Sequence, residues 1–285
     1  MQAKEEIIQD LFATHAFRVS PADEPFWYTS GKFGPYYVNT HFLYGSEEEA
    51  QKLLQTIDYS LDYPLGLPRV VGIACMRQYS KSAIYKRVID NLLEIAEDLD
   101  FDLISGGARR DFFFSFPVAE LLGKDHLSIL KDGSVYHSTA NFKSIREVSE
   151  NEFRNKKVLH IADLVTSASS YLRAWLPAIE NCGAKIADTL VVVDRNQGGA
   201  ENLNMENVNL HSLLRLNADF FAQAKDMGEI SEQQEKQLLR FAKDPNAYMI
   251  SFLEDHPGFL ENSAKKDERS AERVERFKTL GIIPS

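Results

Sequence analysis

The feature that most constrains the fold is a buried strand that leads directly into a loop of small residues and then a helix. The strand is the apolar run Val158, Leu159 and Ile161, which has the length of a strand in a parallel sheet. A helical pattern resumes at Tyr171. The loop between them consists of Thr166, Ser167, Ala168, Ser169 and Ser170. A strand-loop-helix unit of this kind is typical of α/β folds.

The composition of this loop indicates a phosphate site. Small hydroxyl residues at a helix entrance leave backbone N–H groups uncovered, and the positive end of the helix dipole favours an anion there. Asp163, three residues earlier, can accept hydrogen bonds from sugar hydroxyls. Together they suggest a sugar phosphate. The alternative is an ordinary turn with Thr166 or Ser167 as the N-cap. A P-loop is excluded because no G-x-x-x-x-G-K-[ST] string occurs in the chain.

Two further motifs occur in a fixed order with this one. A second apolar strand, residues 186–193, ends in the string D-R-N-Q-G-G at 194–199, and residues 30–39 read S-G-K-F-G-P-Y-Y-V-N. With these three motifs, residues 26–216 resemble the type I phosphoribosyltransferases, and among them the orotate phosphoribosyltransferases. An insertion is expected between residues 60 and 98.

The resemblance implies a phosphoribosyltransferase type I fold: a parallel sheet flanked by helices, with a small N-terminal hood. It implies an enzyme that transfers the 5-phosphoribosyl group from 5-phosphoribosyl 1-diphosphate (PRPP) to a pyrimidine base, orotate to OMP. Mg²⁺ would assist, held through PRPP with no direct protein ligand. Two alternatives stay open: a non-catalytic or regulatory PRPP- or nucleotide-binding protein, and a phosphoribosyltransferase for another base.

For PRPP, the resemblance implies that residues 166–170 seat the 5′-phosphate and that Asp163 contacts the ribose. The family has a second acidic residue where this chain has Ala162, and glycine where it has Ala168. The second change is mild if the local φ is negative. Arg109 and Arg110 occupy the pyrophosphate loop, where guanidinium groups suit a diphosphate. The alternative for this pair is a surface position with no ligand.

For the base, Arg195 could pair with an acceptor carboxylate, its alternative being a structural ion pair with Asp194 or a neighbouring strand. Tyr36 and Tyr37 could stack on a pyrimidine, although aromatics in short strands usually pack. Thr29 stands where the orotate family has lysine. The family's mobile catalytic loop maps to residues 131–150, with Lys131 in register with a family lysine and His137 as a candidate acid or base.

Composition limits the partners and the compartment. The chain of 285 residues carries a formal net charge of −10 without a local basic patch, which argues against nucleic acid. Cys75 and Cys182 lie in apolar contexts and predict free buried thiols in a reducing cytosol. No segment resembles a signal peptide or a membrane span. We therefore expect a cytoplasmic protein, a homodimer by resemblance, that binds small-molecule substrates.

The pattern along the chain predicts a phosphoribosyltransferase domain over residues 1–217, with its hood at about 1–60, and a helical C-terminal extension over 218–285. Alternating strands and helices predict a parallel sheet with helices on both faces. The expected strands lie at 69–76, 101–107, 126–131, 158–161 and 186–193, with two short ones within 26–38. The expected helices lie at 3–17, 46–60, 80–99, 112–122 with a kink at Pro117, 220–243 and 264–278.

Overall fold

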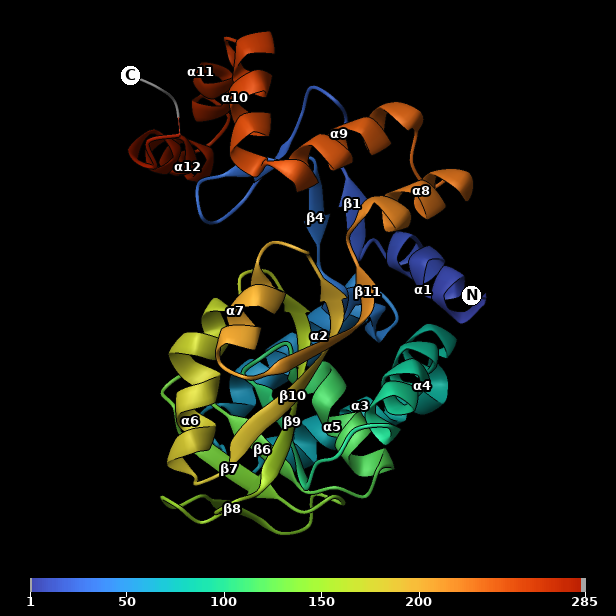
Figure 1. Cartoon of the computed structure of the whole chain (residues 1–285), viewed down its shortest axis with the longest axis vertical. Coiled ribbons are helices and arrows are strands. Elements are labelled where there is room, and N and C mark those ends of the chain that lie inside the picture. The colour runs from blue at the N-terminus through green and yellow to red at the C-terminus, as the bar shows by residue number, and fades with distance from the viewer. Residues whose placement is uncertain (1, 283–285) are drawn as a thin grey trace. The chain divides into compact units, whose positions relative to one another are not determined.

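The computed structural model describes residues 2–282, which form two compact units (Figure 1). The sheet unit combines the N-terminal residues up to Ala16 with Asn39–Arg215. The tail unit combines Phe17–Val38 with the residues from Leu216 onward. Residues 17–38 therefore group with the C-terminal helices. Whether the chain divides into folding domains at residue 217 stays a prediction.

A seven-stranded sheet forms the centre of the sheet unit, in the order β11-β10-β9-β5-β6-β7-β8. The strands from β11 to β6 run parallel, whereas β7 and β8 are antiparallel to their neighbours. The strands are β5 (Leu103–Gly107), β6 (His126–Ile129), β7 (Val135–Ser138), β8 (Ile145–Glu147), β9 (Lys157–Val165), β10 (Lys185–Asp194) and β11 (Asn209–Arg215). The predicted parallel sheet is confirmed.

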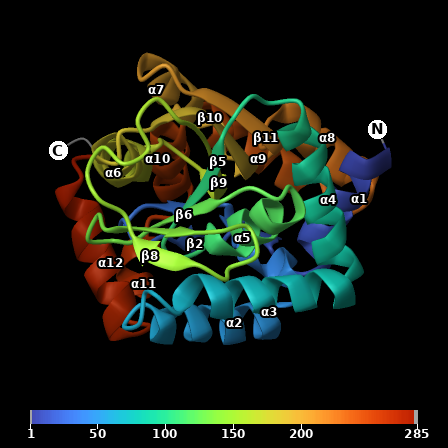
Figure 2. The ribbon, with the colours of Figure 1, turned by 90° about the horizontal axis from the view of Figure 1, so that it is seen from below.

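Helices cover both faces of this sheet (Figures 1 and 2). α4 (Ala83–Glu97) and α5 (Phe112–Leu121) pack on one face, and η2 (Tyr171–Trp175) with α6 (Leu176–Asn181) packs on the other. The alternation along β9 explains this arrangement, because Val158, His160 and Ala162 face η2 and α6 while Leu159 and Ile161 face the opposite side. A strand buried on both faces needs apolar side chains at nearly every position.

The remaining elements of this unit are α1 (Gln2–Ala13), η1 (Thr40–Tyr44), α2 (Glu47–Ser60), α3 (Leu67–Lys81) and α7 (Gly199–Met205). Ser46 caps α2 as predicted, its hydroxyl accepting from Glu49 N at 3.2 Å. Pro117 cannot supply the helical N–H that would bond the Phe113 carbonyl. The Tyr85 hydroxyl donates to that carbonyl instead.

The predicted strand at residues 69–76 is wrong, because this segment lies within the helix α3. Its run of apolar residues lacks clear periodicity, since Val70 and Ile73 are 47% and 44% exposed while Val71 and Cys75 are buried. α3 packs on α5 and α2 packs on α3, which places both helices in an outer layer (Figure 2). Both cysteines are free and buried, as predicted.

The segment 131–150, expected as a mobile loop, contains the antiparallel strands β7 and β8. β7 pairs with β6, so this segment extends the sheet. These strands are hard to predict from the sequence because each has only three or four residues.

The tail unit is built around aromatic side chains. β1 (Phe17–Val19) pairs with β4 (Tyr36–Val38), and β2 (Phe26–Trp27) pairs with β3 (Phe33–Gly34). Its helices are α8 (Ala218–Asp226), α9 (Glu232–Lys243), α10 (Pro245–Asp255), α11 (Phe259–Ala264) and α12 (Glu268–Thr279). The ring of Phe33 is fully buried and lies 5.1–5.5 Å, between centroids, from those of Phe252, Phe259 and Phe277.

The two predicted tail helices are confirmed in part. The expected helix over residues 220–243 is interrupted between α8 and α9, where Gly228 has a positive φ of 79°. The expected helix over 264–278 corresponds to α12. Within residues 2–282, no helix is both long and apolar enough to cross a bilayer.

Candidate functional site

A cavity of about 270 Å³ opens at the carboxyl ends of β5 and β9. In parallel sheets, ligands bind at this edge. The loop after β5 contributes Arg110 and Asp111, and β9 contributes Ala162 and Asp163. Gly107 must be glycine here, because a Cβ at this position would collide with the Trp175 ring that closes one side.

Asp163 is buried at the base of this cavity and is held by hydrogen bonds. Its Oδ2 accepts from the Thr40 hydroxyl at 3.0 Å, and its Oδ1 accepts from Leu164 N at 2.8 Å. Burial first, and then the nearby Asp111 carboxylate, raise the pKa of Asp163 to about 7 against the opposing effects of Arg110 and the Thr40 hydroxyl. Near neutral pH this carboxyl group can therefore exchange a proton.

Asp111 is a second buried carboxylate in the same cavity, 7% exposed. Its Oδ1 accepts from Asp163 N at 3.1 Å and its Oδ2 accepts from Gly107 N at 2.9 Å. Asp111 thus joins the ends of two neighbouring strands. No role is predicted for Asp111 from the sequence, because only the fold brings the loop after β5 against the end of β9. Its position directly after two arginines was the only local signal.

Behind the carboxylates lies a buried histidine. His160 Nδ1 and the Ser105 hydroxyl are 2.9 Å apart, and His160 Nε2 is 3.6 Å from Asp111 Oδ2. Another histidine, His41, is buried close to the pyrophosphate loop. Burial first, and then the charges of Arg110 and Arg109, lower the pKa of His41 to about 3, so its ring is neutral.

The two arginines of the loop after β5 have different surroundings. Arg109 forms an ion pair with Asp58 of α2. Both arginines line the cavity and act on His41, and Arg110 also acts on Asp163. Of this pair, Arg110 is therefore the better placed to meet an anion in the cavity.

The loop at residues 166–170 is open to an anion. In the part of the chain that the structure describes, no backbone N–H of Thr166, Ser167 or Ala168 donates a hydrogen bond. A hydrogen bond from α7 holds the loop in place, since Asn202 Nδ2 donates to the Ser167 carbonyl at 3.0 Å. At Gly199 a Cβ would lie 2.8 Å from the Thr166 carbonyl oxygen, so only glycine allows this approach. Ser170 also lines the cavity.

Ala168 has a φ of +57°, in the left-handed region. Replacing glycine by alanine is mild only where φ is negative, and Ala168 does not meet this condition. The left-handed residue turns successive N–H groups toward one side, a geometry that binds anions. The helix begins after the loop without a side-chain cap at Ser170, so Thr166 and Ser167 are not its N-caps.

Arg195 follows β10, and its N–H donates to the Val165 carbonyl at 2.9 Å, next to the phosphate loop. The carboxylate of Asp194 pairs with Arg215 of β11, at 2.9 Å from its Nε. Asp194 therefore has Arg215 as an ion-pair partner, and the alternative role of Arg195, an ion pair with Asp194 or a neighbouring strand, stays a prediction. Arg195 is not among the residues that line the cavity.

Tyr36 and Tyr37 belong to the tail unit. Tyr36 is 2% exposed, with its ring stacked 5.3 Å from Phe17 and edge-on to Phe241 at 5.6 Å. Its faces are occupied by protein, which corrects the expectation that it stacks on a base. Tyr37 is half-buried and contacts Phe26 and Tyr28. A base-stacking role for Tyr37 stays a prediction.

The two catalytic candidates of segment 131–150 do not meet at the cavity. Lys131 is exposed in the turn after β6. His137 lies in β7 opposite Leu127, and its Nε2 is 2.8 Å from the carboxylate of Asp125, at the amino end of β6. That end of the parallel strands is opposite to the edge that carries the cavity. This placement favours a structural role for His137.

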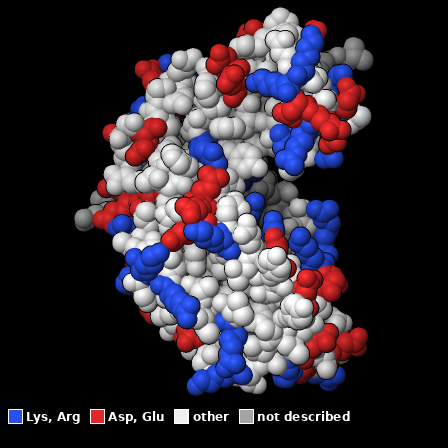
Figure 3. Space-filling model, turned by 180° about the vertical axis from the view of Figure 1, so that it is seen from behind, with Lys and Arg blue, Asp and Glu red and all other residues white. Residues whose placement is uncertain are grey.

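Charge on the molecular surface is mixed. On the face shown in Figure 3, lysine and arginine side chains are interspersed with aspartate and glutamate. This face carries no continuous basic surface of the kind that binds nucleic acid.

The chain is similar to known phosphoribosyltransferases in sequence and in fold. No protein-family model matches the chain. Adenine phosphoribosyltransferase of Caldicellulosiruptor saccharolyticus is 31% identical over 128 residues, 42% of this chain and 73% of the relative. Orotate phosphoribosyltransferase of Saccharolobus solfataricus is 25% identical over 158 residues, covering 54% and 74% of the two chains. The crystal structure of orotate phosphoribosyltransferase from Francisella tularensis has the same fold, with a TM-score of 0.55 at 14% identity over 84% of this chain and 98% of that one.

A sheet edge that combines an open anion loop, buried carboxylates and an arginine can bind a phosphorylated sugar. The chain belongs to the type I phosphoribosyltransferases.

Proposed function

We propose that this chain transfers the 5-phosphoribosyl group from PRPP to a pyrimidine base, with orotate as the acceptor. The observation that carries the proposal is the cavity where Arg110, two buried carboxylates and Ser170 of the open loop meet. Phosphoribosyl transfer needs a seat for the 5′-phosphate, contacts to the ribose hydroxyls and neutralisation of the departing pyrophosphate. At this edge of the sheet, the open loop would seat the 5′-phosphate, the two carboxylates would contact the ribose hydroxyls, and Arg110 would neutralise the pyrophosphate.

In this proposal, the unpaired N–H groups of residues 166–168 bind the 5′-phosphate. Arg110 contacts the pyrophosphate, where negative charge develops as the glycosidic carbon loses its leaving group. Asp163 and Asp111 accept hydrogen bonds from the ribose hydroxyls. Asp111 thereby supplies the carboxylate that the sequence lacks at Ala162, from a neighbouring strand end instead of from β9.

Mg²⁺ fits the proposal as part of the substrate. It would arrive chelated by the diphosphate oxygens of PRPP and would neutralise their charge. Within residues 2–282, no group of three or more acidic, histidine or cysteine side chains is placed to hold a metal ion. The chain's own contribution is then the guanidinium of Arg110 and the hydrogen bonds to the sugar phosphate.

Orotate is the proposed acceptor because it carries a carboxylate and because Arg195 follows a strand end beside the phosphate loop. Relatives named orotate phosphoribosyltransferase and uridine 5′-monophosphate synthase support this choice. Adenine is the second candidate, because a relative that shares 31% identity is an adenine phosphoribosyltransferase. Adenine has no carboxylate and would not need Arg195.

The test is to incubate the chain with PRPP, Mg²⁺ and one base at a time, and to measure pyrophosphate release with orotate, uracil and adenine. Orotate should react fastest. Arg110→Ala should raise KM for PRPP roughly tenfold or more, the equivalent of one charge-assisted hydrogen bond. Arg69→Ala, an exposed arginine of α3, is the matched control.

Arg195→Ala tests the acceptor. A charge-assisted pair with the orotate carboxylate contributes on the order of 2 to 5 kcal/mol, so the variant should lose its preference for orotate over uracil. Equal losses with both bases would reject the orotate assignment. PRPP binding without pyrophosphate release from any base would favour the non-catalytic alternative.

A further inference from the structure

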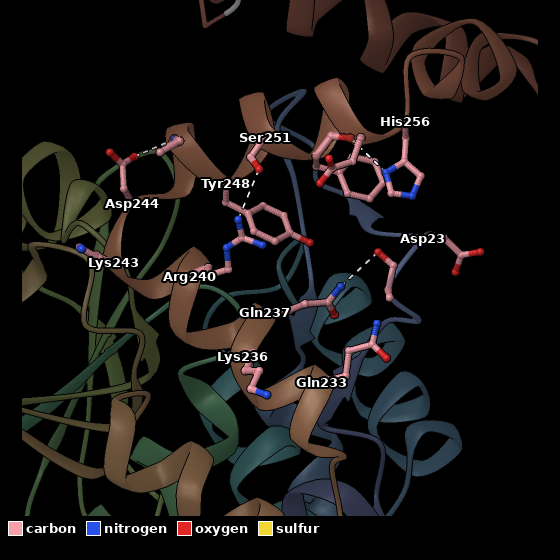
Figure 4. Close-up of a pocket in the computed structure, with 14 residues that line it drawn as sticks. Asp23, Gln233, Lys236, Gln237, Arg240, Lys243, Asp244, Tyr248, Ser251 and His256 are labelled. Carbon is pink, nitrogen blue, oxygen red and sulfur yellow. Dashed lines mark hydrogen bonds between the residues drawn. The ribbon is translucent and has the colours of Figure 1, made fainter.

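A second, larger cavity lies entirely within the tail unit. It has a volume of about 810 Å³ and is formed by α9, α10 and the segment at Ala22 and Asp23 (Figure 4). Small-molecule sites typically occupy about 300–1,000 Å³. None of the residues that line this cavity belongs to the phosphoribosyltransferase motifs, and the proposed transfer reaction does not use it.

Cations line one side of this cavity. Lys236, Arg240 and Lys243 follow one another at helical spacing, so they share one face of α9. In the described part of the chain, neither Arg240 nor Lys243 forms an ion pair with a carboxylate. Among residues 2–282, the only side-chain hydrogen-bond partner of Arg240 is the Ser251 hydroxyl, at 3.5 Å (Figure 4). The carboxylates of Asp244 and Asp255 also line the cavity. Because, among the described residues, neither carboxylate pairs with Arg240 or Lys243, these two cations still favour an anionic ligand.

The opposite wall, on α10, is aromatic. Tyr248 and Phe252 stack with centroids 6.4 Å apart, and His256 stacks on Phe252 at 4.3 Å with an interplanar angle of 11°. His256 Nδ1 is 3.1 Å from the Phe252 carbonyl, which can only accept, so this nitrogen carries the proton. Nε2 of the neutral ring is then an acceptor. Tyr248 and Phe252 are buried, so the half-buried ring of His256 is the part of this wall that a planar group with donors can reach, and it offers both a ring surface and an acceptor.

Two further groups would accept hydrogen bonds from a ligand. Gln237 donates its Nε2 to the Ala22 carbonyl at 3.1 Å, whereas its Oε1 is buried without a partner among residues 2–282. A buried acceptor without a partner is unusual in a folded protein. Asp23 lies at the side of the cavity away from Lys243 (Figure 4). Its carboxylate suits hydroxyl groups and disfavours a second anion.

We propose that this cavity binds a nucleoside monophosphate, with the phosphate at Arg240 and Lys243, the base against the aromatic wall of α10 and the ribose hydroxyls toward Asp23. The mixed charge excludes a polyanion, and a free phosphate would leave the aromatic wall and the Gln237 acceptor unused. A mononucleotide belongs to the class of product that the proposed transfer reaction makes. The site therefore gives the tail unit a role in sensing that product.

The test is calorimetric titration of the full chain with uridine 5′-monophosphate and, separately, with adenosine 5′-monophosphate. Arg240→Ala/Lys243→Ala should weaken binding at this site roughly tenfold or more. Lys265→Ala/Arg269→Ala removes the same charge from exposed positions outside the cavity and should change nothing. Both double variants change exposed side chains, so their melting temperatures should match that of the wild type.

Arg110→Ala separates this site from the transferase site. A binding event that is lost in Arg110→Ala and kept in Arg240→Ala/Lys243→Ala belongs to the sheet unit, and the reverse pattern belongs to the tail unit. Nucleotide binding unchanged by Arg240→Ala/Lys243→Ala would overturn the proposal. Inorganic phosphate binding as tightly as the nucleotides would also overturn it, because it would show an anion site without recognition of the base.

Discussion

At the scale of single residues, the proton on Asp163 links the site to stability. Its pKa is raised from 3.8 to about 7 by burial first and then by Asp111, against the charge of Arg110 and the Thr40 hydroxyl. The folded chain therefore holds a proton that the unfolded chain releases. The stabilisation from this proton is complete below about pH 4, falls as pH rises, and is lost once pH passes 7.

Asp163→Asn should remove this pH dependence, because the amide resembles the protonated acid and cannot ionise. The melting temperature of the variant relative to the wild type should rise between pH 4 and pH 7 and stay level above. Asp62→Asn, at an exposed position, is the matched control. Thermal unfolding at several pH values measures the effect. A difference that stays constant from pH 4 to 8 would show that Asp163 does not hold the proton.

At the scale of elements, the loop at residues 166–170 carries a strained alanine. Ala168 has a left-handed φ, which costs roughly 1–2 kcal/mol for a residue with a Cβ. Its methyl group is 3% exposed, and burial of that methyl offsets about 0.8 kcal/mol of the cost.

Ala168→Gly should therefore leave the free energy of unfolding unchanged or raise it slightly. Ala178→Gly is the matched control, because Ala178 is equally buried but helical, and the change should cost roughly 1–2 kcal/mol there. Denaturant unfolding of both variants makes the comparison. Equal losses at the two positions would show that the loop stores no strain at Ala168.

Prediction from sequence succeeded where one local pattern determines an element. β9 and β10 were found because continuous apolar runs mark strands buried on both faces. It failed for α3, whose apolar residues on two faces hid the helical period. In the site, the open loop and Asp163 were local motifs. Asp111 and Thr40 come from distant segments, and no local pattern shows that they meet Asp163.

At the scale of the whole molecule, each of the two units combines two separate segments of the chain. A division at residue 217 would separate Phe17–Val38 from the helices with which these residues form one unit. Trp27 stacks on Phe259 at 5.6 Å, and Phe33 contacts three rings from the C-terminal helices. The N-terminal strands of the tail unit cannot bury their aromatic side chains without those helices.

A chain that ends at residue 217 should therefore be poorly soluble and should expose Trp27. Its tryptophan emission should shift to the red relative to the full chain. Trp175, the only other tryptophan, belongs to the sheet unit, so Trp27→Phe in the shortened chain identifies the source of the shift. A soluble fragment with unshifted emission would show that residues 17–38 are stable without the tail.

The aromatic core that joins Phe33 to Phe277 also sets the order of events on the ribosome. At synthesis rates of about 5–20 residues per second, roughly 10–50 seconds separate the two phenylalanines. During that interval the seven-stranded sheet can assemble, whereas the aromatic side chains of β2 and β3 stay exposed to solvent. The newly made chain is then a natural client for chaperones until its last helix has left the exit tunnel.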